Sequence, residues 1–248
     1  MRVNAVSKKD AYPVPDIQDT LDHLRAARYF ATFDLLSGYW QLGLTERAKE
    51  RSAFCTRRGL FQFTRMPFGL CGAPSTFCRL MEIVLSDLKW RIGLYYLDDI
   101  IIYARSPQEL LQRLRTVLDL VREVGLQVKL TKCVLFQTEI HFLGHQVSEN
   151  GAEPLPDRIE AIQNWPTTHC IRDVRAFFGL ASYYRKFVCD FALITEPLSW
   201  LTQKQAKFEW TQETQEAFDR LETALVEATS LAFPYPNRPC ILDTMLPT

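Results

Sequence analysis

The stretch from Ile92 to Arg105, IGLYYLDDIIIYAR, constrains the fold of this chain more than any other part of the sequence. Apolar and aromatic residues lead up to Asp98 and Asp99, and a second run of the same kind follows them. Two such runs around a short polar break predict a β-hairpin with the acids at its tip. Adjacent carboxylates beside apolar surface repel each other and are costly to desolvate, which favours a bound cation such as Mg²⁺. A plain polar turn, in which Asp is common, is the alternative.

A second acidic position ends another strand-like run. In Tyr29–Leu44, YFATFDLLSGYWQLGL, Asp34 follows an aromatic run and precedes a Leu-Leu-Ser-Gly-Tyr segment. Three carboxylates from two neighbouring strands can hold two metal ions about 3.5–4 Å apart, the arrangement used for in-line phosphoryl transfer. Such a site requires the two strands to lie side by side, which is an expectation at this point.

Three motifs in the chain resemble those of one enzyme family. They are FDLLSGYWQ at Phe33–Gln41, MPFGLCGAPSTF at Met66–Phe77 and YLDD at Tyr96–Asp99. They are similar to the catalytic motifs of reverse transcriptases, and most of all to those of gypsy-type LTR retrotransposons and retroviral-like pol polyproteins. The resemblance runs in order over nearly the whole chain. It implies an RNA-directed DNA polymerase, a nucleotidyltransferase that joins a dNTP to a primer 3′-hydroxyl on an RNA or DNA template.

The order of predicted elements indicates an α+β fold. The clearest helix starts at the capping box Ser106–Glu109 and ends before Gly125. Strand, helix, two strands, helix and strand make a ferredoxin-like split βαβ layer, which is the polymerase palm that the resemblance implies. We expect partial fingers and palm at residues 1–148, a helical thumb or connection segment at 149–230, and the truncated start of a ribonuclease H domain at 231–248. Other predicted elements are strands at Tyr29–Asp34, Leu126–Leu130, Cys133–Phe136 and Ile140–Val147, helices at Asp16–Arg28, Ser75–Trp90, Asp157–Trp165, Ile171–Val188 and Thr211–Ala228, and a Gly/Pro hinge at Glu149–Pro156.

The resemblance also implies roles for individual residues of the metal site. Asp34 and Asp98 would bridge two Mg²⁺ or Mn²⁺ ions, and Asp99 would complete the set. The carbonyl of Leu35 would be a further metal ligand. Lys132, in the KLTKC segment, is similar in place to a lysine that protonates the pyrophosphate leaving group, and a basic side chain suits general acid catalysis there. An exposed lysine without a catalytic role is the alternative.

Two further positions would contact the incoming nucleotide. Tyr39 resembles the aromatic gate that collides with a ribose 2′-hydroxyl and so selects deoxynucleotides; a core tyrosine is the alternative. Phe68, in MPFGL, falls where the family packs against the nucleotide's sugar and base. Gly69 would allow close approach of the backbone there.

Two segments resemble primer- and template-binding elements. The FLGH segment is similar to the primer grip, a hairpin that positions the primer end, and consists of Phe142, Leu143, Gly144 and His145. The stretch IRDVRAFFGLASYYRKFV resembles the signature of the helical thumb. Four of its basic residues could face the phosphates of a duplex, namely Arg172, Arg175, Arg185 and Lys186. An ordinary amphipathic helix with a basic outer face is the alternative.

Composition bounds the cellular setting. Lys plus Arg equals Asp plus Glu at 29 each, so any basic surface has to be local. Residues 46–65 are a candidate, because they contain six basic residues and only two acidic ones. A merely solvated surface is the alternative for that cluster. The seven cysteines show no zinc-type spacing, the N-terminus has no apolar signal core, and no apolar run approaches about 20 residues. These features indicate an intracellular protein that is not secreted and has no membrane partner, and the resemblance implies cytoplasm, virus-like particle or nucleus as its location.

Two departures from the family pattern leave three functions open. The chain starts near the end of the family's first fingers motif, and Thr244 is followed by Met245 where a Thr-Asp pair would begin ribonuclease H. We therefore expect a palm and thumb fragment without ribonuclease H, which binds primed template, dNTPs and other pol polyprotein segments. A catalytically inactive remnant that at most binds nucleic acid or a protein is the second hypothesis. A two-metal nuclease or phosphatase is the third, and the order of motifs disfavours it.

Overall fold

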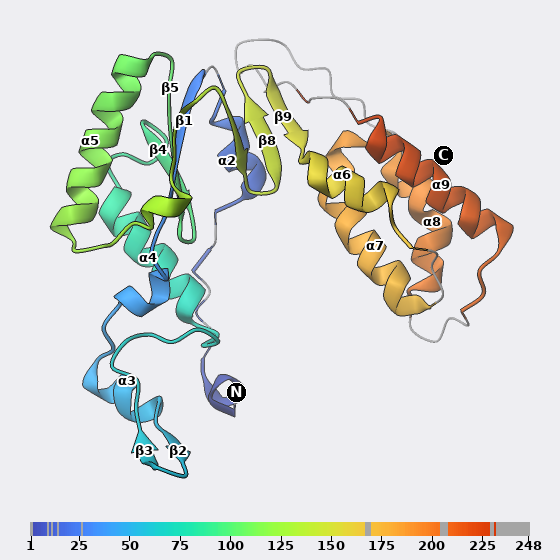
Figure 1. Cartoon of the computed structure of the whole chain (residues 1–248). Coiled ribbons are helices and arrows are strands. Elements are labelled where there is room, and N and C mark those ends of the chain that lie inside the picture. The colour runs from blue at the N-terminus through green and yellow to red at the C-terminus, as the bar shows by residue number, and fades with distance from the viewer. Residues whose placement is uncertain are drawn as a thin grey trace. The chain divides into compact units, whose positions relative to one another are not determined.

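The computed structural model describes residues 2–8, 10, 12–13, 15–25, 27–166, 170–203, 208–228 and 231 (Figure 1). The chain separates into two compact units, Met1–Ile140 and His141–Thr248. Each unit has its own cluster of buried apolar side chains. None of the helices in the described ranges is long and apolar enough to cross a membrane.

A four-stranded antiparallel sheet forms the centre of the first unit. Its strands are β1 (Tyr29–Asp34), β4 (Gly93–Tyr96), β5 (Asp99–Ala104) and β6 (Val134–Gln137), in the spatial order β4-β5-β1-β6. The strands β4 and β5 form the hairpin that the sequence predicts, and Leu97 and Asp98 make its turn. The predicted first strand matches β1 in both bounds.

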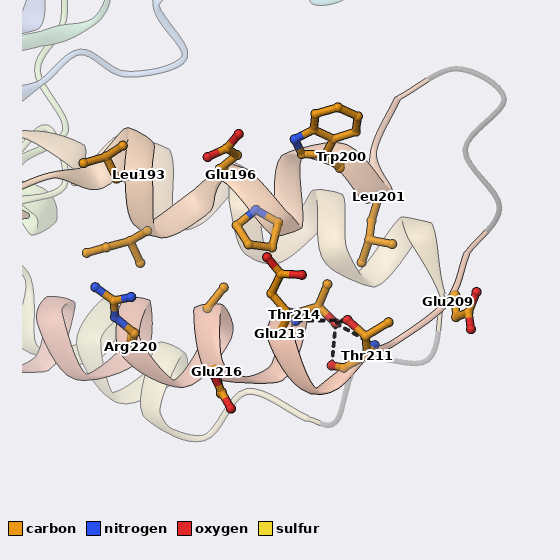
Figure 2. A pocket seen from close by; sticks show the side chains of 13 residues that line it. Leu193, Glu196, Trp200, Leu201, Glu209, Thr211, Glu213, Thr214, Glu216 and Arg220 are labelled. Carbon is orange, nitrogen blue, oxygen red and sulfur yellow. Dashed lines mark hydrogen bonds between the residues drawn. The ribbon is translucent and has the colours of Figure 1, made fainter. Parts of the chain in front are cut away.

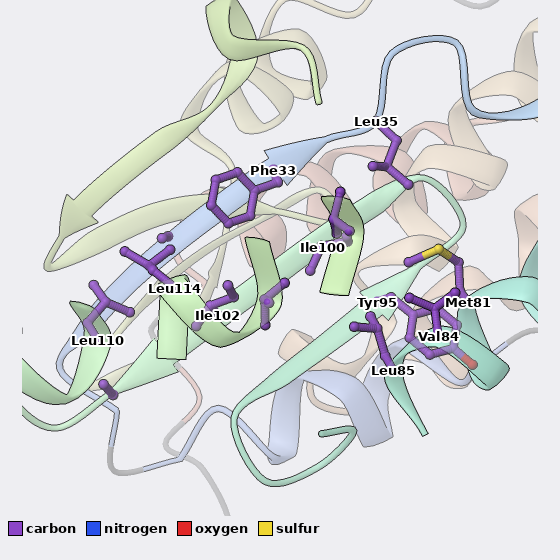
Figure 3. Packing of buried hydrophobic residues seen from close by; sticks show 14 of the residues in the cluster. Phe33, Leu35, Met81, Val84, Leu85, Tyr95, Ile100, Ile102, Leu110 and Leu114 are labelled. Carbon is purple, nitrogen blue, oxygen red and sulfur yellow. The ribbon is translucent and has the colours of Figure 1, made fainter. Parts of the chain in front are cut away.

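Two helices cover one face of this sheet, α4 (Ala73–Leu85) and α5 (Pro107–Glu123) (Figure 3). Alternate residues of β1 and β5, among them Phe33, Ile100 and Ile102, point into this core. Ile101 and Tyr103 of β5 are buried too, which explains why the strand after Asp99 is an unbroken apolar run rather than an alternating one. Each large apolar side chain buried there contributes about 1.5–3 kcal/mol.

The cap of α5 follows the sequence prediction at Ser106, whereas Glu109 bonds the amide of Arg105 rather than that of Ser106. The hydroxyl of Ser106 accepts a hydrogen bond from the amide of Glu109 at 3.2 Å, and the Glu109 carboxylate accepts one from the amide of Arg105 at 2.8 Å. Gly125 has a φ of 73°, the left-handed conformation of a residue that ends a helix. A cap of this kind is worth about 1 kcal/mol of helix stability.

One predicted strand of the first unit is wrong. Residues Leu126–Leu130 form no strand, and Val128 makes a single bridge to Leu35. The amide of Leu36 donates to the carbonyl of Gln127, and the amide of Lys129 donates to the carbonyl of Asp34. The backbone of this segment is therefore hydrogen-bonded to the end of β1 and the turn after it. The other elements of this unit are α1 (Arg2–Val6), α2 (Ile17–Asp22), α3 (Glu46–Arg51), β2 (Phe54–Thr56), β3 (Gly59–Phe61) and the 3-10 helices η1 (Gly38–Gln41) and η2 (Leu130–Lys132).

The second unit combines a small sheet with helices. A three-stranded sheet has the order β7-β8-β9. The predicted strand Ile140–Val147 is instead a hairpin, and the predicted helix Ile171–Val188 ends at Tyr183. The elements are β7 (Glu139–Phe142), β8 (His145–Ser148), β9 (Gly151–Pro154), α6 (Pro156–Gln163), α7 (Ile171–Tyr183), the 3-10 helix η3 (Arg185–Phe187), α8 (Phe191–Leu201) and α9 (Gln212–Val226).

The first compact unit ends at Ile140, before the hinge expected around residue 148. The reason is that the Gly/Pro-rich stretch there is a tight turn and a strand rather than a linker. Ser148 pairs with Gly151 at the end of the β8–β9 hairpin. At the far end of the chain, Leu231 bridges Ala152. The rest of the segment expected to start a ribonuclease H domain, residues 232–248, lies outside the described residues.

Candidate active site

The sheet register brings the three predicted acids to one end of two neighbouring strands. Asp34, the last residue of β1, is the partner of Asp99, the first residue of β5. Asp98 occupies the turn beside it, and its carbonyl accepts a hydrogen bond from the amide of Leu35 at 3.1 Å. Residues 64 positions apart in sequence (98 − 34) are therefore adjacent in the fold. The strand adjacency that a shared metal site requires is present.

The turn that presents Asp98 has a strained backbone. Leu97 has a φ of 55°, in the left-handed region that β-carbon sterics disfavour by about 1–2 kcal/mol for a residue other than glycine. Such conformations persist where the surrounding structure over-determines them, and they cluster at functional sites. Here the paired strands β4 and β5 enforce the two-residue turn.

Lys132 lies within this acidic group. Its Nζ is 2.7 Å from Oδ2 of Asp34, with 55% of the lysine side chain and 20% of the aspartate side chain exposed. The hydrogen bond to Asp34 and the charge of that carboxylate raise the pKa of Lys132, so its ammonium group keeps its proton at neutral pH. The sequence placed Lys132 near the metal site only by resemblance, and the structure puts it in direct contact with a predicted ligand.

Three carboxylates around one ammonium group leave an excess of negative charge. Asp99 is exposed as a residue, but protein around its carboxyl group removes water from it and so raises its pKa. The charges of Asp98 and Asp34 raise that pKa further, while Lys132 lowers it. A divalent cation would relieve this repulsion, and carboxylate oxygens are the ligands that Mg²⁺ prefers.

The side chains are not gathered around a single point. Within the described ranges, no group of three or more His, Cys, Asp or Glu side chains is close enough to hold a metal ion. The carboxylate of Asp34 is instead engaged by Lys132. Leu35 is fully buried and bridges Val128, and the role of its carbonyl as a metal ligand stays a prediction. The three carboxylates are of the ligand type that a hard cation prefers and lie at adjoining strand ends, but in the arrangement described they do not form a metal-binding cluster.

The two predicted nucleotide-contacting side chains also come together. The ring centroids of Tyr39 and Phe68 are 5.1 Å apart, and Tyr39 packs edge-on against Phe77 at 5.6 Å. Phe68 remains 52% exposed, so one of its faces is open to a ligand. Partial burial raises the pKa of Tyr39, and the nearby charge of Asp98 raises it further. Tyr39 thus links the aromatic pair to the acidic group.

Glycines allow this close packing. A β-carbon on Gly38 would lie 2.9 Å from Cζ of Phe77 and 3.3 Å from Cβ of Asp98. Gly69 has a φ of 87°, which favours glycine over any other residue. Both positions therefore require glycine for steric or backbone reasons, and Gly38 does so directly against a predicted metal ligand.

Two polar side chains that support the site were missed by the sequence analysis. The amide nitrogen of Asn4 donates to the carbonyl of Gly69 at 2.7 Å, and its oxygen accepts from the amide of Cys71 at 3.0 Å. Gln41 donates to the carbonyls of Leu36 and Gln127 and accepts from the Gln127 amide at 2.7 Å. Gln41 belongs to the FDLLSGYWQ motif, so the sequence did mark it as a candidate, whereas Asn4 lies in no such motif.

The predicted primer-grip residues occupy the turn of the β7–β8 hairpin in the second unit. Phe142 and His145 are buried at the two ends of this turn. Leu143 and Gly144 form the turn itself, with φ angles of 45° and 69°. The FLGH segment therefore contains the two-residue turn of a hairpin, and a hairpin is the geometry that the resemblance implies.

The four basic residues of the predicted thumb do not share one helix. Arg172 and Arg175 belong to α7, whereas Arg185 and Lys186 belong to η3. The guanidinium of Arg175 donates to the carbonyl of Thr202 at 2.8 Å, at the end of α8. Arg172 and Arg185 are exposed. Their contacts with phosphates stay a prediction.

A cavity of about 610 Å³ lies between α8 and α9 (Figure 2). Four glutamates and one arginine are among its lining residues, together with the exposed ring of Trp200. This excess of negative charge would repel a phosphate backbone. None of the predicted site residues lines the cavity. The charged lining residues are Glu196, Glu209, Glu213, Glu216 and Arg220.

Comparisons with known families and proteins agree with this geometry. The family model described as reverse transcriptase (RNA-dependent DNA polymerase) matches residues 1–147. The chain is 36% identical over 233 residues to a retrovirus-related Pol polyprotein from transposon 412 of Drosophila melanogaster, covering 94% of this chain and 19% of that protein. It is 34% identical over 255 residues to the Pol polyprotein from transposon gypsy of the same organism, covering 98% and 25%. The chain therefore spans about a fifth to a quarter of the length of these relatives.

Two solved structures share the fold. A foamy viral protease-reverse transcriptase dRH in complex with double-stranded DNA matches with a TM-score of 0.85 and 26% identity, over 93% of this chain and 41% of that one. The foamy viral protease-reverse transcriptase in complex with an RNA/DNA hybrid matches with a TM-score of 0.84 and 26% identity, over 93% and 31%. The α+β polymerase architecture expected from the sequence is confirmed by these matches.

Proposed function

Because this chain belongs to the reverse transcriptase (RNA-dependent DNA polymerase) family, we propose that it transfers deoxynucleotides to a primer 3′-hydroxyl on an RNA or DNA template. The observation that carries the proposal is the placement of Asp34 opposite Asp99 with Asp98 in the adjoining turn. The palm and partial fingers belong to the first unit in this proposal, and the helical thumb belongs to the second.

Two Mg²⁺ or Mn²⁺ ions would supply activation of the primer hydroxyl and neutralisation of the triphosphate. Asp34 and Asp98 would hold both ions, and Asp99 with the carbonyl of Leu35 would complete the ligand set. This assignment fits the excess negative charge at the strand ends and the raised pKa of Asp99. Binding of the metals would compete with Lys132 for the Asp34 carboxylate.

Lys132 would then donate a proton to the pyrophosphate leaving group. Its ammonium group holds its proton firmly because Asp34 raises its pKa. Asp34 would also be a metal ligand, and a Lys132 ammonium group less tightly paired with Asp34 would give up its proton more easily. A general acid of this kind typically contributes about 10²–10⁴-fold to a rate.

Tyr39 and Phe68 would form the floor for the sugar of the incoming dNTP. Their rings lie 5.1 Å apart, and Gly69 keeps the backbone beside them free of a side chain. A ribose 2′-hydroxyl would collide with Tyr39, so the pair would favour deoxynucleotides.

The second unit would contact the primed template. The β7–β8 turn would place the primer end, and the basic residues on α7 and η3 would contact phosphates. Structural neighbours of this chain are reverse transcriptases in complex with double-stranded DNA or an RNA/DNA hybrid, which supports nucleic acid as the partner. Pairing with other segments of a pol polyprotein is part of the same proposal, because the chain spans only part of its relatives.

Primer extension tests the proposal. The purified chain should incorporate dTTP on poly(rA)/oligo(dT) with Mg²⁺ or Mn²⁺, and Asp98→Asn should abolish incorporation. Asp119→Asn is the matched control, since Asp119 is an exposed acid of α5 that pairs with Arg122. Binding of the duplex without turnover by the unaltered chain would favour the alternative, a nucleic-acid-binding remnant. Release of mononucleotides instead would point to a nuclease.

A further inference from the structure

We propose that Tyr183 and Tyr184 are positioning residues that fix the turn of the β7–β8 hairpin and, through it, the primer end. The inference rests on the proposed function, in which this hairpin is the primer grip. It adds the last residue of α7, Tyr183, and its C-cap, Tyr184, to the machinery that orients the primer, and neither of them needs to touch the reacting atoms.

The turn itself has a backbone that needs external support. Leu143 and Gly144 both have left-handed φ angles, 45° and 69°, which is the pattern of a tight two-residue hairpin turn. Gly144 adopts this conformation readily, but Leu143 does not, because its β-carbon is crowded there. A strained turn of this kind keeps one conformation only when its surroundings hold it.

Three hydrogen bonds hold the two carbonyls of the turn. The hydroxyl of Tyr183 donates to the carbonyl of Leu143 at 2.6 Å, and the hydroxyl of Tyr184 donates to that of Gly144 at 2.6 Å. His145 Nδ1 lies 2.7 Å from the Leu143 carbonyl. Since a carbonyl only accepts, Nδ1 must carry the proton. Two of the three donors come from a helix about 40 residues further along the chain.

Ring packing fixes these donors in place. His145 and Tyr184 are almost completely buried, and their ring centroids lie 5.6 Å apart. The ring of Tyr183 sits 5.4 Å from that of His145, and a β-carbon on Gly144 would approach it to 3.1 Å. The close fit explains why glycine occupies the second turn position. Tyr183 also keeps one face exposed.

The same helix carries basic residues proposed to contact phosphates. Arg172 and Arg175 belong to α7, which ends at Tyr183. A duplex bound along α7 would therefore be coupled to the hairpin turn through two hydroxyl–carbonyl contacts. Removing the hydroxyls should leave both rings packed while it frees the turn, which separates positioning from folding.

The test is the double variant Tyr183→Phe/Tyr184→Phe in the full chain. Tyr103→Phe is the matched control, because its hydroxyl also donates to a backbone carbonyl, that of Trp90 at 2.9 Å, in the first unit. We expect hydrogen exchange at the amides of the turn to be about tenfold faster in the double variant, with exchange in α7 unchanged. A 2-aminopurine base at the primer 3′ end should change its fluorescence, because the end is no longer held in one place.

Kinetics complete the test. The single-turnover rate at saturating dNTP should fall about tenfold or more in the double variant, since displacement of a reacting group by about 1 Å can cost 10²-fold. The Kd for primer–template should stay within about twofold, because phosphate contacts dominate that affinity. A purely structural role would reduce the amount of active protein but leave the single-turnover rate and the fluorescence of the bound primer end unchanged.

The outcomes separate this inference from the proposed function. Unchanged turn exchange, fluorescence and rate in the double variant, with normal incorporation, would overturn the inference alone. The absence of incorporation in the unaltered chain, with the expected changes in exchange and fluorescence, would overturn the polymerase proposal and support the positioning role. Effects of Tyr103→Phe equal to those of the double variant would also overturn the positioning role, because the effects would then not be specific to the turn.

Discussion

The ammonium group of Lys132 lies 2.7 Å from the carboxylate of Asp34, across 98 residues of sequence. One of the three acids proposed to hold metal is therefore already neutralised by a side chain of this chain. In the proposed function the metal and the lysine would use the same carboxylate, so the affinity for metal and the protonation of the lysine would be coupled.

Replacement of Lys132 by Gln should separate metal binding from chemistry. Without the ammonium group, Asp34 and its neighbours attract a divalent cation more strongly, so the Mg²⁺ concentration for half-maximal rate should fall. The rate at saturating Mg²⁺ should fall by about 10²- to 10⁴-fold, because the proton donor is lost. Single-turnover primer extension over a series of Mg²⁺ concentrations measures both. Lys129→Gln is the control for the change in net charge, and a Lys132→Gln enzyme with unaltered metal dependence and rate would refute the coupling.

The acid side of the pH–rate profile should reflect Asp99. Its pKa is raised by desolvation and by Asp98 and Asp34, and metal binding requires the ionised form. Activity at subsaturating Mg²⁺ should therefore be lost, as the pH falls, at a higher pH than an ordinary aspartate would give. Because Lys132 lowers the pKa of Asp99, Lys132→Gln should move this limb to still higher pH. An acid limb that stays in place in the variant would contradict this electrostatic coupling.

Tyr39 should control the choice of sugar. Its ring is held between Phe68 and Phe77, at 5.1 and 5.6 Å, so it has little freedom to move away from a 2′-hydroxyl. Tyr39→Val should reduce discrimination against ribonucleotides by about 10- to 100-fold, whereas Tyr39→Phe, which keeps the ring, should not. The ratio of kcat/KM for dTTP and UTP on the same primed template measures the effect. If the Val variant still discriminated fully against UTP, Tyr39 would be a core residue with no role in the choice of sugar.

A methyl group at Gly38 should damage both stability and catalysis. The added carbon would lie 2.9 Å from the buried ring of Phe77 and 3.3 Å from Cβ of Asp98. Overpacking of this kind costs about 1–3 kcal/mol of unfolding free energy and would displace Asp98. Gly43→Ala is the matched control, since nothing lies within 4 Å of its added carbon and its effect should be within about 0.5 kcal/mol. Equal urea midpoints and rates for the two variants would show that the site tolerates the displacement.

The sequence was sufficient for features that depend on local pattern. The apolar runs around Asp98 and Asp99 predicted the hairpin, and Ser106 with Glu109 predicted the start of α5, because apolar runs, turns and caps are set by neighbouring residues. The sequence placed both acids at strand ends but left the adjacency of the two strands as an expectation, which the pairing of Asp34 with Asp99 meets. The family motifs supplied the remaining residues of the proposed metal site.

Contacts between distant backbone groups could not be read from the sequence. The segment after Gly125 has the composition of a strand, yet its amides and carbonyls serve the turn beyond Asp34. The same is true of Asn4, which holds the loop at Gly69, and of the hydroxyl of Tyr184 on the Gly144 carbonyl. Each is a single polar atom that meets a carbonyl from a distant segment, and no periodicity in the sequence marks such a pair.

His145 should make the stability of the second unit depend on pH. Burial of the ring is the main reason that its pKa falls to about 4 from an ordinary value of 6.5, and the nearby charge of Lys186 lowers it as well. Rings of Tyr183, Tyr184 and Phe187 surround it, and its Nε2 has no partner among the described residues. Protonation would therefore place an unsolvated charge inside the unit.

The sign of the effect follows from these values. The unfolded chain binds the proton of His145 at about pH 6.5, and the folded chain does so only near pH 4. The stabilisation is complete above pH 6.5 and is lost as the pH falls toward 4, by an amount on the order of 3 kcal/mol over that range. Urea unfolding at pH 7 and at pH 4.5, monitored by hydrogen exchange in α7, measures this loss of stability. His145→Phe should flatten this dependence, whereas replacement of the exposed His141 by Asn should not; an equal pH dependence in His145→Phe and the parent chain would show that other groups cause it.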